Sequence, residues 1–325
     1  MAVPDRLVSN DEIAEWLGGV DAAWIAKRTG TRERPWASGD ERLSGLAADA
    51  GRRALEQAGL EPHELDLVIV ATSTADEITP NAGPLVAGLI GADRAGALDV
   101  GAACTGWLSA LSLACGQIES RRARHALVVG ADFLSRFVDV SDRDTAPLFA
   151  DGAGAAVVSA TESARGRVGP VVLRSDHSGS QLIRLGRGEQ IQMDGRETFR
   201  IGVSSLSQVT AEALAASDCH LEDIDLFVYH QANSRIIRAV GERLGLPAER
   251  VVDYVERFAN ASTATLPIAL TVAQAEGRIR PDDRVLLAAF GGGLTWGATV
   301  VQWSARASEP AVTPAVAQPS VMPTV

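Results

Sequence analysis

One cysteine of the chain lies where a strand leads into a helix, a position that suits a nucleophile. Cys104 occupies the segment Gly101-Ala-Ala-Cys-Thr-Gly-Trp107, with a predicted strand at Ala97–Val100 before it and a helix of small residues after it. The positive end of a helix dipole and the free N–H groups of the first turn favour a thiolate. The alternative is a small buried apolar side chain, which is our interpretation of Cys115 and Cys219.

Two polar side chains of the second half suggest partners for this thiol. His230 ends an apolar strand in Leu226-Phe-Val-Tyr-His-Gln-Ala-Asn233, at the strand end where α/β folds place ligands. Asn260 lies in Arg257-Phe-Ala-Asn-Ala-Ser-Thr263, just before a second apolar helix. Taken alone, His230 also fits a hydrogen-bonded structural histidine, and Asn260 fits a helix N-cap.

A run of three glycines follows a predicted strand near the C-terminal end and could supply backbone N–H groups for the same reaction. The run Gly291-Gly-Gly293 allows backbone N–H groups to approach a reacting carbonyl closely. No Gly-Lys-Ser/Thr follows it, so it is not a phosphate-binding P-loop.

Strands and helices that would position these residues occur twice along the chain. The segment Glu64–Val70 matches Asp223–Tyr229, and the predicted strand at Leu127–Val129 has a counterpart at Val285–Ala288. Two predicted helices, Cys104–Ile118 and Ala264–Ala275, are apolar on all sides, which is typical of helices buried between other layers of the fold. This duplication predicts an α/β fold in which the two halves pack as layers around one pseudo-twofold axis.

The domain organisation follows from the duplication. We expect an N-terminal half over residues 1–162 with the cysteine, and a C-terminal half over 163–304 with His230 and Asn260. Residues 5–35 are predicted to be helical. Residues 305–325 contain repeated prolines and no periodicity, which predicts a disordered Pro/Ala-rich tail.

Composition excludes several classes of protein. The 325 residues are 46% hydrophobic, and the net charge of -11 argues against a nucleic-acid partner. The three cysteines have no metal-ligand spacing, and their odd number fits a reduced cytoplasmic protein without a metal site. No signal peptide or membrane-spanning run is present.

The full set of motifs resembles the β-ketoacyl-ACP synthase III family of the thiolase superfamily. The matching segments cover nearly the whole chain and are Trp24-Ile-Ala-Lys-Arg-Thr-Gly30, the Cys104 segment, Phe149-Ala-Asp-Gly-Ala-Gly154, Tyr229-His-Gln-Ala-Asn233, the Asn260 segment and Phe290-Gly-Gly-Gly-Leu-Thr-Trp-Gly297. The resemblance implies a thiolase-like five-layered α-β-α-β-α sandwich. It also implies a catalytic triad of Cys104, His230 and Asn260.

The resemblance further implies how substrates bind. The N–H groups of Cys104 and Gly292 would form an oxyanion hole. The positions that match family residues around CoA and its pantetheine arm are Trp24, Arg28, Arg143 and Asn233.

Partners are implied in the same way. Arg235 falls on the helix with which family members dock the acyl carrier protein, and Arg238 shares its helix face. The family is homodimeric and uses no metal or redox cofactor.

The expected reaction is a priming condensation for fatty acid or polyketide synthesis. An acyl-CoA would acylate Cys104, and the acyl group would then condense decarboxylatively with malonyl-ACP. The alternative is a synthase-like acyltransferase of secondary metabolism, which passes the acyl group to a carrier protein, hydroxyl or amine without condensation.

Four departures from the family pattern suggest an acyl substrate other than acetyl, and two of them, beside Asn260 and at Ile78–Pro80, keep this alternative open. Ala259 replaces the usual glycine before the catalytic asparagine, Leu294 stands where phenylalanine is common, and the segment Ile78–Pro80 is unusual. The first strand of the family, expected before Val3, is missing.

Overall fold

Two four-stranded sheets form the body of the protein in the computed structural model, which describes residues 1–161 and 166–304. The N-terminal sheet has the order β4-β3-β5-β6 and contains β3 (Leu67–Ala71), β4 (Gly96–Val100), β5 (His125–Phe133) and β6 (Asp151–Ser159). The C-terminal sheet has the order β10-β11-β12-β7 and contains β7 (Val172–Ser175), β10 (Leu226–Tyr229), β11 (Arg284–Gly291) and β12 (Thr295–Gln302).

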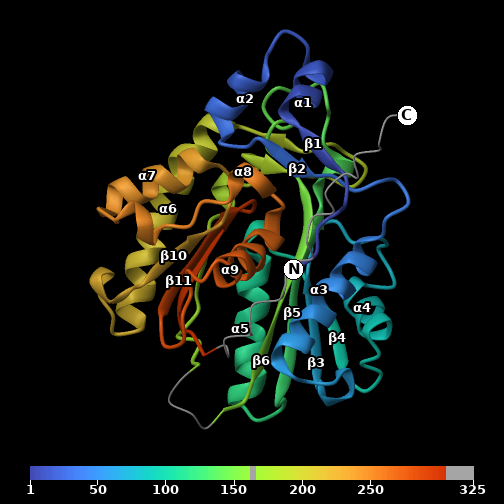
Figure 1. Ribbon diagram of the computed structural model, residues 1–325, viewed down its shortest axis with the longest axis vertical. Coiled ribbons are helices and arrows are strands. Elements are labelled where there is room, and N and C mark those ends of the chain that lie inside the picture. The colour runs from blue at the N-terminus through green and yellow to red at the C-terminus, as the bar shows by residue number, and fades with distance from the viewer. Residues whose placement is uncertain (162–165, 305–325) are drawn as a thin grey trace, which may run out of the picture.

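Helices separate and cover the two sheets (Figure 1). The helices α5 (Gly106–Glu119) and α9 (Thr265–Ala275) lie between the sheets, and most of their apolar residues are buried there, Leu113 of α5 being exposed. The outer faces are covered by α3 (Leu43–Ala58) and α4 (Ala82–Ile90) on one side, and by α6 (Gly195–Ala216) and α7 (Ser234–Leu244) on the other. The predicted five-layered thiolase-like sandwich is therefore confirmed.

Strand pairing repeats between the two halves. The parallel pair β3–β5 starts with Leu67 opposite Ala126, and the parallel pair β10–β11 starts with Leu226 opposite Val285. In each half the second of these strands pairs antiparallel with the next, β6 or β12. The matched sequence segments thus form equivalent strands. The predicted boundary at 162/163 and the tail over 305–325 lie outside the described residues.

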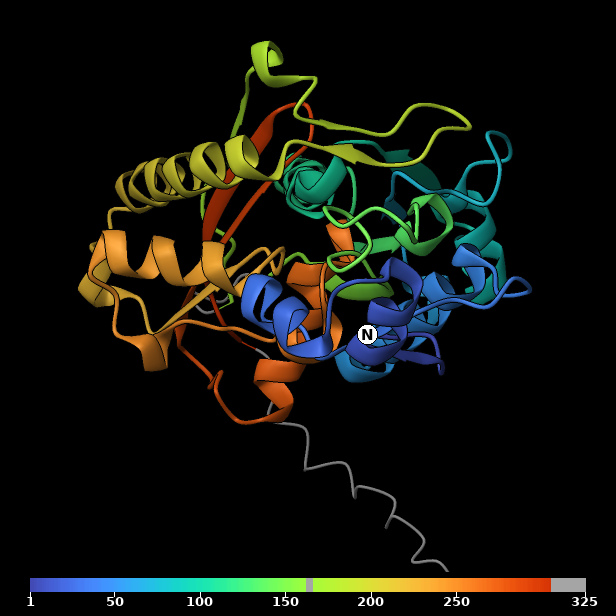
Figure 2. The same cartoon turned by 90° about the horizontal axis from the view of Figure 1, so that it is seen from above.

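Residues 7–35 form a cap above the ends of the sheets (Figure 1). They contain β1 (Leu7–Ser9), α1 (Asn10–Leu17), α2 (Ala22–Thr29) and β2 (Glu33–Pro35). The prediction that residues 5–35 are helical is wrong at both ends, because β1 and β2 pair with each other as antiparallel strands. The cap brings α2 beside α7 (Figure 2).

The outer edges of the two sheets differ. Beyond β12 the C-terminal sheet continues with β7, whereas beyond β6 the described residues add only an antiparallel bridge between Ala2 and Ala153.

Short elements connect the layers and carry the site. They are two 3₁₀ turns, η2 (Ala103–Thr105) and η7 (Ser262–Ala264), the helix α8 (Val255–Phe258), and the small hairpin of β8 (Ile183–Arg184) and β9 (Gln192–Met193). Within the described ranges, no helix is both long and apolar enough to span a membrane.

Candidate active site

Cys104 lies in η2, the turn that leads directly into the buried helix α5. Its Sγ is 3.6 Å from the Oγ of Ser262, which donates a hydrogen bond to it. Although Cys104 is partly exposed, burial of the thiol raises its pKa to about 11. Desolvation of the sulfur thus opposes the thiolate that the helix position was predicted to favour, and it outweighs the hydrogen bond from Ser262.

Gly291, the first residue of the triple glycine, packs directly against Cys104 and leaves no space for a side chain. A Cβ on Gly291 would lie 2.8 Å from both the backbone N and the Cβ of Cys104. A side chain at this position would therefore displace the cysteine, which explains the glycine physically. Gly292, predicted for the oxyanion hole, follows Gly291 directly and begins the turn between β11 and β12.

His230 directly follows β10, and its backbone N–H donates to the carbonyl oxygen of Ala288 at 2.8 Å. Its Nδ1 lies 2.6 Å from the Oγ1 of Thr265. Burial lowers the pKa of the imidazole to about 3, so His230 is neutral at physiological pH. Only the Nε2 side of the ring is left for a substrate.

Asn260 is held by backbone and side-chain hydrogen bonds. Its N–H donates to the carbonyl oxygen of Leu148, and its own carbonyl accepts from the N–H of Ala150, each at 3.0 Å. Its Oδ1 accepts from the N–H of Ser262 at 2.9 Å. The N-cap interpretation is wrong, because α9 begins only at Thr265. The Asn260 Nδ2 group remains as a donor for a substrate.

Ser262 and Thr265 connect the three predicted catalytic residues. Ser262 contacts Cys104 through its hydroxyl and Asn260 through its N–H, and its carbonyl accepts from Thr265, which also bonds His230. Sequence reasoning missed both residues and also Asp132. The available signals were the hydroxyl-rich run after Asn260 and an acidic residue inside the apolar strand 125–133.

Backbone strain marks the same segments. Positive φ angles occur at three non-glycine residues beside the triad, which are Ala103 (44°), Ala259 (47°) and Ser262 (49°). Such conformations persist where the surrounding structure enforces them, and they cluster at active sites. Ala259 therefore adopts a backbone conformation that favours glycine.

Three of the predicted CoA-binding residues, Trp24, Arg28 and Asn233, lie on or beside α2 and the start of α7. The guanidinium of Arg28 stacks over the ring of Trp24, 4.5 Å from its centroid. Asn233 donates from Nδ2 to the carbonyl oxygen of Arg28 at 3.1 Å. Arg143 reaches the carbonyl oxygens of the loop before α2 at 3.1 and 3.2 Å. The sequence could not show that these segments meet.

The predicted carrier-docking arginines lie on the exposed face of α7. Arg235 and Arg238 are both exposed, and the helix buries Ile237 and Val240 on its opposite side. The Arg235 guanidinium lies 5.5 Å from the ring centroid of Phe199. The two charges therefore face outward on the helix that Asn233 caps.

A duplicated five-layered fold with a cysteine at the start of one central helix, and with histidine and asparagine joined to it by hydrogen bonds, defines a thiolase-type condensing enzyme. Two family models match the chain. They are described as 3-oxoacyl-[acyl-carrier-protein (ACP)] synthase III, over residues 98–177, and its C-terminal part, over residues 214–303.

Relatives and solved structures agree with these matches. The chain is 42% identical to a β-ketoacyl-[acyl-carrier-protein] synthase III of Rhizorhabdus wittichii, over 93% of this chain and 97% of the relative. It is similar to the crystal structure of 3-oxoacyl-[acyl-carrier-protein] synthase III from Aquifex aeolicus, with a TM-score of 0.90, 37% identity and coverage of 93% and 97%. It is also similar to the priming β-ketosynthase from the R1128 polyketide biosynthetic pathway, with a TM-score of 0.89, 35% identity and coverage of 93% and 94%.

The chain belongs to the β-ketoacyl-ACP synthase III family. The predictions of the family, of the fold and of an acyl-transferring enzyme are confirmed.

Proposed function

We propose that the protein transfers an acyl group from acyl-CoA to Cys104 and condenses it decarboxylatively with malonyl-ACP, in the priming of fatty acid or polyketide synthesis. The observation that carries this proposal is the joining of Cys104, His230 and Asn260 through Ser262 and Thr265. The chemistry uses no metal or redox cofactor, and we expect it in the cytoplasm.

Each residue has one role in this reaction. The thiolate of Cys104 attacks the acyl-CoA, and the N–H groups of Cys104 and Gly292 stabilise the oxyanion. In the second half-reaction His230 and Asn260 donate hydrogen bonds to the malonyl thioester oxygen as CO2 leaves. In the free protein Thr265 donates to the Ser262 carbonyl oxygen, so Nδ1 of the neutral ring donates to Thr265. For Nε2 to donate to the thioester oxygen, the Thr265 hydroxyl turns from that carbonyl to Nδ1 and the ring takes the other neutral tautomer.

Substrates enter along the α2–α7 junction. Trp24 and Arg143 would flank the adenine of CoA, Arg28 the phosphates, and Asn233 the pantetheine arm. Acyl carrier proteins are acidic and this chain carries a net charge of -11, so docking needs a local basic surface. Arg235 and Arg238 supply one.

A homodimer would cover an exposed apolar edge. The edge strand β4 carries Leu98, which is 40% exposed, and the nearby segment before α4 carries Ile78, which is 74% exposed. Edge strands with exposed apolar residues favour pairing with another chain, and a twofold axis would place β4 against β4. Analytical ultracentrifugation of a Leu98→Lys variant tests this, with a shift to monomer expected.

The function is tested by following both half-reactions. Incubation with a panel of acyl-CoA substrates should add the acyl mass to the peptide that holds Cys104, and addition of malonyl-ACP should then release CO2 and give the β-ketoacyl-ACP. Cys104→Ala should abolish the acylation, whereas Cys115→Ala should not. Labelling that survives in Cys104→Ala would refute the assignment. Acylation without CO2 release from any carrier protein would favour the acyltransferase without condensation.

A further inference from the structure

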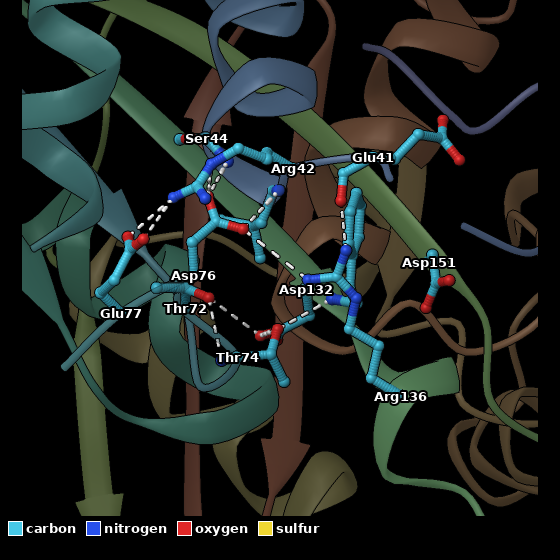
Figure 3. Close-up of polar contacts among 12 residues, drawn as sticks. Glu41, Arg42, Ser44, Thr72, Thr74, Asp76, Glu77, Asp132, Arg136 and Asp151 are labelled. Carbon is cyan, nitrogen blue, oxygen red and sulfur yellow. Dashed lines mark hydrogen bonds and ion pairs between the residues drawn. The ribbon is translucent and has the colours of Figure 1, made fainter. Parts of the chain in front are cut away.

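Asp132 is a buried carboxylate to which the proposed reaction assigns no role. It lies near the end of β5, and its side chain has no solvent exposure. Its Oδ1 accepts hydrogen bonds from Thr72 Oγ1 at 3.1 Å, the Ser73 N–H at 2.8 Å and Thr74 Oγ1 at 2.9 Å (Figure 3). A buried carboxylate is costly unless its oxygens are hydrogen-bonded, so its contacts indicate what it holds in place.

The hydroxyl groups around Oδ1 indicate that Asp132 is ionised. Thr72 Oγ1 accepts from the Thr74 N–H at 3.1 Å, and Thr74 Oγ1 accepts from the Phe133 N–H at 2.8 Å. The single proton of each hydroxyl is then directed to Asp132. Burial raises the pKa of the carboxyl group, and the hydrogen bond from the Ser73 N–H opposes this rise. An ionised carboxylate can only accept, which suits a side chain surrounded by donors.

The other carboxylate oxygen contacts the catalytic turn of the C-terminal half. Oδ2 of Asp132 accepts from the N–H of Thr263, the middle residue of η7, at 3.4 Å. The same strand also packs against the carbonyl of this residue, because a Cβ on Gly130 would lie 2.7 Å from the Thr263 carbonyl oxygen. Strand β5 therefore contacts Thr263 at both its N–H and its carbonyl group.

The residue before Thr263 connects this anchor to the predicted catalytic side chains. Ser262 has a φ of 49°, a conformation that persists where the surrounding structure enforces it. Its N–H donates to Oδ1 of Asn260 at 2.9 Å, and its carbonyl accepts from Thr265 at 3.0 Å. Thr265 Oγ1 in turn lies 2.6 Å from Nδ1 of His230. The η7 turn therefore lies behind both groups that the proposed reaction uses on the malonyl thioester.

We propose that Asp132 is a positioning residue for the condensing step. By holding the Thr263 N–H, it fixes η7 in the conformation in which the Ser262 N–H orients the Asn260 amide, so that Nδ2 of Asn260 faces the thioester oxygen. Asp132 acts through the turn and not on the substrate. Acylation depends on the placement of Cys104 in η2, against Gly291 of the other half. Loss of Asp132 should therefore slow the second half-reaction much more than the first.

This inference rests on the proposed function and is tested by measuring both half-reactions in Asp132→Asn. The amide oxygen can keep the three donors of residues 72–74, which turns its NH2 group toward the Thr263 N–H, so that two donors meet and the anchor is lost. The kcat for CO2 release from malonyl-ACP should fall by about 10- to 10²-fold, because Asn260 is misplaced. The KM for malonyl-ACP and the rate of Cys104 acylation should remain close to those of the wild type.

A second variant removes the hydrogen bond and keeps the negative charge. Replacing the peptide bond between Ser262 and Thr263 with an ester removes the Thr263 N–H and leaves the Asp132 carboxylate and both side chains unchanged. The kcat for CO2 release should fall at least as far as in Asp132→Asn, again without an equal loss of acylation. If Asp132→Asn does not fold, the ester variant decides the test alone.

The matched control is Asp76→Asn. The Asp76 side chain is only 4% exposed and also accepts from two backbone N–H groups, but these belong to Leu43 and Ser44 at the start of α3 (Figure 3). Its replacement removes a buried carboxylate without touching η7. Any loss of folded enzyme in this control should lower acylation and CO2 release in the same proportion.

The possible failures are distinguishable. Wild-type CO2 release in Asp132→Asn or in the ester variant, or an equal fall of both half-reactions, overturns this inference alone. A selective loss of CO2 release in Asp76→Asn overturns it as well, because the effect would then not depend on η7. A wild type that acylates but releases no CO2 overturns the proposed condensation, and this inference with it.

Discussion

The two halves of the molecule place different residues at one equivalent position. Ala126 of β5 and Val285 of β11 are equivalent, because each pairs with one of the matched residues Leu67 and Leu226. Asp132 follows Ala126 by the same number of residues as Gly291 follows Val285. Each contacts the catalytic turn of the opposite half. Asp132 accepts from the Thr263 N–H in η7, and Gly291 packs against Cys104 in η2. The duplicated backbone therefore gives a reciprocal contact, and the side chains give it two different uses.

The difference shows how a symmetric scaffold supports an asymmetric reaction. In the C-terminal half a glycine leaves room for the nucleophile and for N–H donors. In the N-terminal half a carboxylate anchors the turn after Asn260. A second pair repeats this lesson, because His230 matches Ala71, where the N-terminal half carries no functional group. The comparison can be tested at four points, beginning with the largest expected effect.

Asn260 belongs to the turn that Asp132 anchors, and its replacement should separate the half-reactions. Asn260→Ala should reduce CO2 release from malonyl-ACP by about 10²–10³-fold, because the enolate loses one donor to its oxygen. Acylation of Cys104 should survive. Radiolabelled CO2 release and the mass of the acyl-enzyme are measured side by side, and equal losses in both would contradict this division of labour.

Gly291→Ala breaks the contact on the other side of the comparison. A Cβ there would lie 2.8 Å from the backbone of Cys104 and displace the nucleophile, so acylation should fall by about 10²-fold. Gly45→Ala is the control, because no heavy atom lies within 4 Å of its added Cβ. Rates are read from acyl-enzyme formation and folding from the melting temperature. An unaffected rate in Gly291→Ala would show that the turn can move without consequence.

Charge reversal on α7 should affect only the second substrate. Replacing both Arg235 and Arg238 with Glu should raise the KM for malonyl-ACP about tenfold and leave acylation by acyl-CoA unchanged. The control reverses Arg121 and Arg122, two exposed arginines just beyond the C-terminal end of α5. An equal rise in KM in the control would indicate a general charge effect, and an unchanged KM in the α7 variant would move docking elsewhere.

The smallest effect concerns the strained residue before Asn260. Ala259 has φ 47° and ψ -149°, a conformation suited to glycine, whereas the equally buried Ala261 has φ -89° and ψ 34°. Ala261→Gly should lower the free energy of unfolding by about 1 kcal/mol. Ala259→Gly should not lower it, because relief of strain of about 1–3 kcal/mol offsets the loss of the methyl group. Denaturant unfolding gives both values, and equal losses would refute strain at Ala259.

Much of the fold and of the candidate site could be predicted from the sequence. The duplication of Glu64–Val70 in Asp223–Tyr229 predicted two equivalent sheets, and the helices that are apolar on all sides predicted a central layer. Local pattern carries this information, because hydrophobic periodicity reports which faces are buried. Cys104, His230 and Asn260 likewise stand out by residue type and by the motifs around them, which is enough to predict the candidate triad.

Tertiary structure decided what local pattern does not contain. The ionisation of the site depends on burial, which raises the pKa of Cys104 and lowers that of His230. For the thiol, the position at the start of a helix had predicted a lowered pKa. The hydrogen bonds from Ser262 to the sulfur and from the Thr263 N–H to Asp132 join residues far apart along the chain. Desolvation and hydrogen bonding depend on which groups meet in space, and only the packing of the two halves brings these groups together.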